Sequence, residues 1–143
     1  MSIANVLLVD DEASFVETFA ERLELRNFEI SKAFSGEEAL RILKENQTVE
    51  VVILDVKMPG MDGIETLMEI KRRYPLVEVM MLSGHADVES AIEGMKQGAC
   101  DYLMKPVDMD QIITKVTAAA TKKRQHEEKI IQARIKEITS RRA

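Results

Sequence analysis

The stretch VVILDVKMPGMD, residues 51–62, decides the fold. It begins as an unbroken apolar run, and this run stops at the acidic residue Asp55. A short apolar run bounded by turn residues is typical of a buried parallel strand. Three further apolar runs stop at polar residues in the same way: 5–9 before Asp10 and Asp11, 77–82 before Ser83, and 99–104 before Lys105. Four strands would therefore deliver polar side chains to one edge of a sheet.

Segments with the helical spacing of apolar residues lie between these runs, and a weaker edge strand is predicted at residues 28–34. Three helix starts carry a capping residue with an acid or amide three positions later: Ser35 with Glu38, Asp62 with Glu65, and Asp108 with Gln111. Gly98 marks the end of the fourth helix. Five such strand-helix units with right-handed crossovers predict an α/β fold: a flavodoxin-like (βα)5 doubly wound parallel sheet, strand order 2-1-3-4-5.

In this strand order the direction of winding reverses between the first and third strands, which end at Asp10 and Asp55. Ligands of open α/β sheets bind at such a switch point, outside the carboxyl ends of the strands. The topology therefore predicts a site where the composition also places the acids.

The bulk composition predicts one soluble domain, since the 143 residues are 45% hydrophobic and 31% charged. No apolar stretch approaches the roughly 18 residues of a membrane span, so no membrane partner is expected. The N-terminus carries acids where a signal peptide needs positive charge, and the single Cys100 cannot form an intrachain disulfide. A cytoplasmic location is expected.

Charge is divided unevenly along the chain. Residues 122–143 hold eight Lys or Arg against three Glu, a balance of +5, whereas the remainder carries 12 basic and 22 acidic residues, a balance of −10. Direct nucleic-acid binding by the acidic body is not expected. We expect the division into residues 1–121 and a solvated helical extension or linker, residues 122–143. Its apolar stripe of Ile131, Ile135 and Ile138 could pair with a second copy or fray.

Three carboxylates meeting at the predicted edge would repel one another. At an effective dielectric near 20, one pair about 4 Å apart costs on the order of 4 kcal/mol. A hard divalent cation offsets such repulsion, and Mg²⁺ is the natural candidate because it binds carboxylates, water and phosphoryl oxygens. With Mg²⁺ and Lys105 neutralising a phosphoryl group, Asp55 is placed to act as a nucleophile and become an aspartyl phosphate.

At this point the chain resembles the receiver domains of bacterial two-component response regulators, over residues 4–121. The resemblance depends on these positions: Asp10 and Asp11, Asp55 with Met58, Pro59 and Gly60, Ser83, and Lys105 before Pro106. The stretches 55–67 and 81–106 are similar to receivers of nitrogen-regulation (NtrC-like) transcriptional activators. The resemblance implies a phosphorylation-activated switch that acts on transcription, with a sensor histidine kinase or a small molecule as phosphodonor.

The resemblance also implies a role for each site residue. Asp55 would be the phosphoacceptor, Lys105 would pair with the phosphoryl group, and Ser83 would donate its hydroxyl to it while Tyr102 turns inward as the second switch residue. Mg²⁺ would be held by Asp10, Asp11, Asp55 and the backbone carbonyl of Lys57, whose side chain is then free to differ. The peptide bond before Pro106 would be cis.

The output surface implied by the resemblance is the fourth helix, fifth strand and fifth helix: residues 88–97, Tyr102, and residues 108–115. A partner protein or a second receiver would bind there, and a homodimer is a possible outcome. The chain would be no enzyme beyond its own phosphorylation and dephosphorylation.

Other classes of protein fit the sequence less well. A haloacid-dehalogenase-like phosphatase needs a second Asp where Lys57 stands, and a flavodoxin needs a glycine- and hydroxyl-rich loop where Asp10, Asp11 and Glu12 stand. A receiver-shaped scaffold that is never phosphorylated is disfavoured because every site residue is present. Since the chain ends roughly 22 residues past the receiver, either a stand-alone receiver acting by protein contact or the receiver and linker of a larger regulator is expected.

Overall fold

The structure is a computed structural model that describes residues 2–142, apart from the side chains of His85 and Arg142. Strands and helices alternate along the chain: β1 (Asn5–Val9), α1 (Ala13–Glu24), β2 (Glu29–Ala33), α2 (Gly36–Glu45), β3 (Val51–Asp55), α3 (Gly63–Arg73), β4 (Glu78–Ser83), the 3₁₀ helix η1 (His85–Asp87), α4 (Val88–Lys96), β5 (Asp101–Met104) and α5 (Met109–Arg142).

The strands form one parallel sheet in the order β2-β1-β3-β4-β5, which confirms the predicted topology and the edge position of β2. The registers align the carboxyl ends, with Val9 opposite Ala33 and Leu54, and Ser83 opposite Met104. All strand ends that carry site residues therefore meet at one edge of the sheet.

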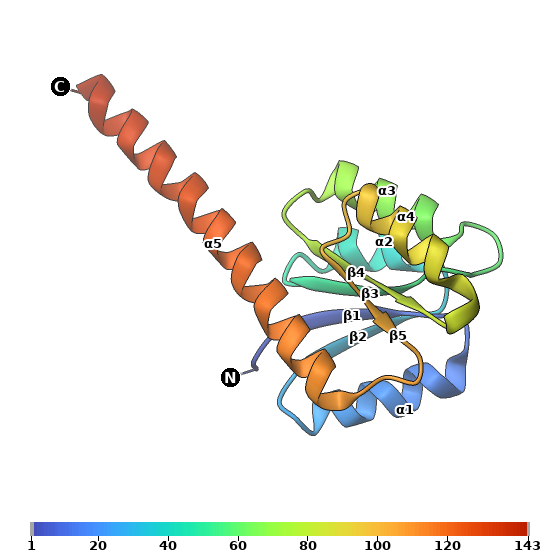
Figure 1. Cartoon of the computed structure of the whole chain (residues 1–143). Coiled ribbons are helices and arrows are strands. Elements are labelled where there is room, and N and C mark those ends of the chain that lie inside the picture. The colour runs from blue at the N-terminus through green and yellow to red at the C-terminus, as the bar shows by residue number, and fades with distance from the viewer. Residues whose placement is uncertain (1, 143) are drawn as a thin grey trace.

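Helices cover both faces of this sheet, with α1 and α5 on one face and α2, α3 and α4 on the other (Figure 1). Successive side chains of a strand point to opposite faces. Leu7 of β1 accordingly packs with α2 and α3, while its neighbour Leu8 packs with α1 and α5. The central strands β1, β3 and β4 are buried along their whole length, which explains their unbroken apolar runs.

The predicted helix ends are confirmed by their hydrogen bonds. The side chain of Ser35 accepts from the Glu38 amide at 3.1 Å, and that of Asp62 accepts from the Glu65 amide at 2.9 Å. Asp108 accepts from the amide of Gln111 at 3.4 Å and, more closely, from that of Asp110 at 2.9 Å. Gly98, with φ +114°, follows α4 in the left-handed region that other residues avoid.

Some strand boundaries differ from the prediction by one or two residues. Asp55 and Ser83 are the last residues of β3 and β4, because the amides of Val56 and Lys105 extend the ladder by donating to Leu82 and Ser83. β5 begins at Asp101 rather than at residue 99, since the Ala99 amide donates to Gly94 and closes the end of α4.

Helix α5 continues without a break through the expected boundary at residue 121, and its second half extends away from the body of the domain (Figure 1). Ile131, Ile135 and Ile138 on this extension are each about half exposed. Within residues 2–142, no helix combines the length and the apolar character that crossing a membrane requires.

Candidate functional site

An acidic cluster lies at the carboxyl edge of the sheet, where the sequence places it. Asp10 follows β1, Asp55 ends the neighbouring strand β3, and one oxygen each of Asp10, Asp11 and Asp55 lies within 4.8 Å of the others. Asp10 and Asp55 are buried, at 1% and 8% exposure, while Asp11 is exposed. The site is thus open to solvent through Asp11 and closed on the side of the sheet.

Lys105 is the cation that the structure brings to this cluster. Its Nζ donates to Asp10 Oδ2 at 2.7 Å, lies 3.9 Å from Glu12 Oε2, and sits 4.5 Å from the centre of the Phe15 ring. Burial by itself would lower the pKa of Lys105, but the hydrogen bond to Asp10 and the surrounding carboxylates outweigh burial and raise it. Lys105 therefore remains charged beside the acids.

The surroundings of Asp55 strongly shift the pKa of its carboxyl group. Burial, followed by the charge of Asp10, raises its pKa from 3.8 to about 7, although Lys105 and the Lys57 amide oppose this shift. Near neutral pH the cluster thus carries more negative charge than one lysine offsets. A bound cation would favour the ionised form of Asp55.

The donor set of the cluster fits a hard divalent ion. Asp10 Oδ1 accepts from the Glu12 amide at 3.0 Å and Oδ2 accepts from Lys105, which fixes this carboxylate while leaving further lone pairs on its oxygens. Asp11 and Asp55 add carboxylate oxygens of the kind that Mg²⁺ prefers. An acidic pocket of this composition is suited to a Mg²⁺-type ion rather than to a metal that requires nitrogen or sulfur ligands.

The predicted switch residues are near the site but do not engage it. Ser83 is fully buried at the end of β4, beside β3, and its hydroxyl contacts Met104 Sδ at 3.6 Å. Tyr102 lies on the edge strand β5 with 37% of its surface exposed, and Lys115 Nζ is 5.5 Å from its ring centre. Among the described residues, neither of these side chains forms a hydrogen bond with Asp55.

The side chain of Lys57 has a contact that the sequence did not predict. Its Nζ forms an ion pair with Asp87 Oδ1 at 2.8 Å, without hydrogen-bond geometry. This pair connects the loop after β3 to η1, the short helix after Ser83. No local signal marks it, because the two residues are 30 positions apart. The Lys105–Pro106 peptide bond is cis, as the resemblance implies.

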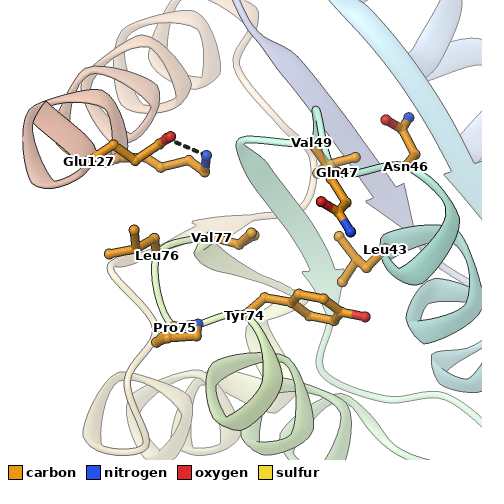
Figure 2. Close-up of a pocket in the computed structure, with 10 residues that line it drawn as sticks. Leu43, Asn46, Gln47, Val49, Tyr74, Pro75, Leu76, Val77 and Glu127 are labelled. Atoms are coloured by element: carbon orange, nitrogen blue, oxygen red, sulfur yellow. Dashed lines mark hydrogen bonds and ion pairs between the residues drawn. The ribbon is translucent and has the colours of Figure 1, made fainter. Parts of the chain in front are cut away.

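A hollow of about 400 Å³ lies beside the acidic cluster. It is lined by residues of the loop after β3, the start of α3 and α4: Val56, Lys57, Met58, Pro59, Asp62, Ile64 and Ser90. A second hollow, of about 350 Å³, lies at the opposite edge of the sheet between α5, the connection from α2 to β3 and the connection from α3 to β4 (Figure 2). Only the first hollow adjoins residues of the predicted site.

Comparison with known proteins agrees with this geometry. Residues 6–117 match the response regulator receiver domain family. The chain is 40% identical over 121 residues to an NtrX-like response regulator of Rickettsia conorii, covering 83% of this chain and 25% of that protein. It is 39% identical over 108 residues to the transcriptional regulatory protein ZraR of Escherichia coli K12, covering 76% of this chain and 24% of that protein.

A solved structure, that of NtrX from Brucella abortus in complex with ADP, superposes with a TM-score of 0.82 at 32% identity, covering 90% of this chain and 29% of that chain. The fold, the acidic cluster and these matches define the class: the chain belongs to the response regulator receiver domain family. Its relatives include NtrX-like regulators and ZraR. The chain spans about a quarter of the length of the curated relatives it matches.

Proposed function

We propose that the chain is a phosphorylation-activated switch of a two-component system, in which Asp55 accepts a phosphoryl group from a sensor histidine kinase. The observation that carries the proposal is the buried Asp55 carboxylate, grouped with Asp10 and Asp11 and faced by the charged Lys105. A nucleophilic carboxylate among groups that can hold a cation and a phosphoryl oxygen is what phosphoryl transfer requires.

In the proposed reaction a carboxylate oxygen of Asp55 attacks the phosphorus of a phosphohistidine. The new P–O bond forms as the P–N bond breaks, and its electron pair stays on the leaving imidazole nitrogen, which takes a proton from solvent. Asp10, Asp11, Asp55 and the Lys57 carbonyl would hold Mg²⁺, which when bound supplies positive charge for the transferring group. Lys105 would turn from Asp10 toward a phosphoryl oxygen.

The switch step would use the two residues that do not engage Asp55 in this structure. Ser83 would leave Met104 and donate its hydroxyl to the new phosphoryl group, drawing in the connection to α4. Tyr102, now partly exposed, would turn inward behind it. The surface of α4, β5 and α5 would then change shape, so that a partner or a second copy binds there.

The similarity to NtrX-like regulators and ZraR supports a role in transcription control through a larger regulator, with residues 1–121 as receiver and 122–143 as helical linker. A stand-alone receiver that acts by protein contact is the second candidate. In either case the chain catalyses only its own phosphorylation and dephosphorylation, and its acidic body does not bind nucleic acid directly. A cytoplasmic location stays a prediction.

The experiment is incubation with Mg²⁺ and acetyl phosphate, or with the mimic beryllofluoride, while the added mass and the oligomeric state are followed. We expect a Mg²⁺-dependent phosphate adduct in the wild type and in Asp110→Asn, an exposed aspartate of α5, but not in Asp55→Asn. Adduct formation in Asp55→Asn would reject Asp55 as the acceptor. No adduct from acetyl phosphate or from a panel of kinases would leave a receiver-shaped binding module.

A further inference from the structure

Helix α5 pairs a cation with an acid at the start of each of three strands. Lys115 Nζ lies 3.2 Å from Asp101 at the start of β5, and Lys122 Nζ lies 3.7 Å from Glu78 at the start of β4. Arg124 binds Glu50, directly before β3, through Nε at 2.5 Å and a second nitrogen at 2.7 Å. We call these three pairs the α5 clamp: Lys115–Asp101, Lys122–Glu78 and Arg124–Glu50.

The Arg124–Glu50 pair is the most strongly built part of the clamp. Arg124 also donates to the Ile3 carbonyl at 3.0 Å, and Glu50 Oε1 accepts from the Asn5 amide at 3.1 Å. The backbone of Glu50 is itself held by its neighbours, since its amide donates to Asn5 and its carbonyl accepts from Glu78. Two-nitrogen pairing of arginine with a carboxylate fixes orientation as well as distance.

The clamp holds the helix on both sides of its buried stripe. At about 100° per residue, Lys122 and Arg124 point about 200° apart around the helix axis. Between them lies the inward-facing side of the helix, with Ala119, Ala120 and the nearly buried side chain of Lys123. Pairs on opposite flanks resist both rotation of α5 about its axis and tilting to either side.

Apolar packing is thin where the clamp acts. The 350 Å³ hollow lies beside this part of α5 and is walled by Lys123 and Glu127, which pair with each other, facing Tyr74, Leu76 and Val77 (Figure 2). Buried apolar residues of α5 in the core end at Ala120. From residue 121 onward, ion pairs rather than core contacts therefore hold the helix against the sheet.

We propose that Lys122 and Arg124 are positioning residues that fix the direction in which α5 leaves the receiver, so that residues 109–142 move as one rigid rod with the sheet. A change at the α4, β5 and α5 surface would then reach the far end of α5 as a displacement, instead of being lost by bending near residue 121. The inference concerns the unphosphorylated chain and does not depend on Asp55 accepting phosphate.

The test measures the direction of the extension itself. Spin labels are attached to Lys44→Cys on α2 and Lys136→Cys on the extension, both exposed positions, in a Cys100→Ala background. We expect one narrow distance distribution for the otherwise wild-type chain. The double variant Lys122→Gln with Arg124→Gln should broaden it, and should speed amide exchange around residues 120–130 about tenfold, as loss of charge-assisted hydrogen bonds predicts.

The matched control is Lys129→Gln with Arg134→Gln, which removes two cations of the same helix that have no ion pair within the described residues. It should leave both the distance distribution and the exchange unchanged. The single variant Arg124→Lys should restore part of the narrow distribution, since a lysine keeps the charge without the two-nitrogen geometry. If the clamp variant is folded and its distances match the wild type, or if the control broadens them equally, the proposal is overturned.

Discussion

The two edges of the sheet carry similar numbers of acids with opposite consequences. At the carboxyl edge Asp10, Asp11 and Asp55 share one close cation, Lys105, and the pKa of Asp55 is raised to about 7 by burial and by Asp10. At the amino edge, where the strands begin, Asp101, Glu78 and Glu50 each pair with their own cation from α5. The first edge is left with unbalanced charge that a ligand can relieve, while the second is already balanced and serves to hold the structure.

The pKa of Glu50 shows the effect of this charge balance at the amino edge. Burial would raise the pKa of Glu50, but the hydrogen bonds from Arg124 and the Asn5 amide outweigh burial and lower it. The pKa of Asp55 is raised instead, because the nearby cation, Lys105, is shared with the other acids of the cluster. The difference between the edges is thus the supply of positive charge, not the presence of buried carboxylates.

The largest expected effect comes from removing a carboxylate at the carboxyl edge. Asp11→Asn should weaken Mg²⁺ binding at least about tenfold, equivalent to about 1.4 kcal/mol, because it removes one of the three carboxylates proposed to hold the ion without disturbing the Asp10–Lys105 pair. Titration calorimetry or metal-dependent fluorescence measures this. Glu12→Gln, the neighbouring acid outside the cluster, should bind Mg²⁺ nearly as the wild type does; equal weakening in both variants would show a nonspecific charge effect.

The two edges should also give opposite slopes of stability with pH. Asp55 has a folded-state pKa of about 7 against 3.8 for the ordinary group, so the folded chain retains a proton that the unfolded chain releases. Its contribution is therefore fully present below pH 4 and is lost as pH rises through 7. Without metal, Asp55→Asn should be more stable than the wild type at pH 8 by about 1–3 kcal/mol, after allowance for solvent screening, and should gain little at pH 4.

Chemical denaturation with a chelator present, at pH 4, 6 and 8, measures this difference. Glu21→Gln, an exposed acid within α1 and outside the cluster, should follow the wild type at each pH. A stability gain of Asp55→Asn that is independent of pH would mean that the carboxyl is not protonated in the folded chain.

A smaller loss is expected when the amino edge is unbalanced. Glu50→Gln keeps an oxygen for the Asn5 amide but removes the charge that binds Arg124, so the free energy of unfolding should fall by about 1–2 kcal/mol at pH 7. Because the pKa of Glu50 is lowered on folding, its contribution is present above the ordinary carboxyl pKa and is lost as pH falls through the folded value. Variant and wild type should therefore converge near pH 3; a constant difference would point to packing instead of charge.

The smallest loss of stability is expected from an exposed ion pair within one helix. Arg41 and Glu45 form an ion pair within α2, 3.2 Å apart, with both side chains about 60% exposed. Arg41→Gln should change the free energy of unfolding by only about 0.3–0.5 kcal/mol, since water screens such pairs. A larger loss, measured by thermal or chemical denaturation, would show that exposed ion pairs stabilise the chain as much as the pairs at the sheet edge. The position of the clamp at the sheet edge would then not explain its contribution.

The sequence by itself determined the strands, the helix caps, the strand order and the residues of the acidic cluster. This was possible because periodicity, capping and turn chemistry are local, and because the topology brings all strand ends to one edge. The expectation that the basic segment after residue 121 is merely a solvated helix was incomplete. Lys122, Lys123 and Arg124 are paired, and Arg124 is tied to the sheet.

Only the tertiary structure decided which charges meet. Arg124 is 74 positions from Glu50, and Lys105 is 95 positions from Asp10, so no local pattern in the chain connects them. The pKa of Asp55 likewise depends on burial and on charges brought together by folding. Local sequence sets the conformation of the backbone. The balance of charge at each edge depends instead on contacts between residues that are far apart in the sequence, and no local pattern predicts these contacts.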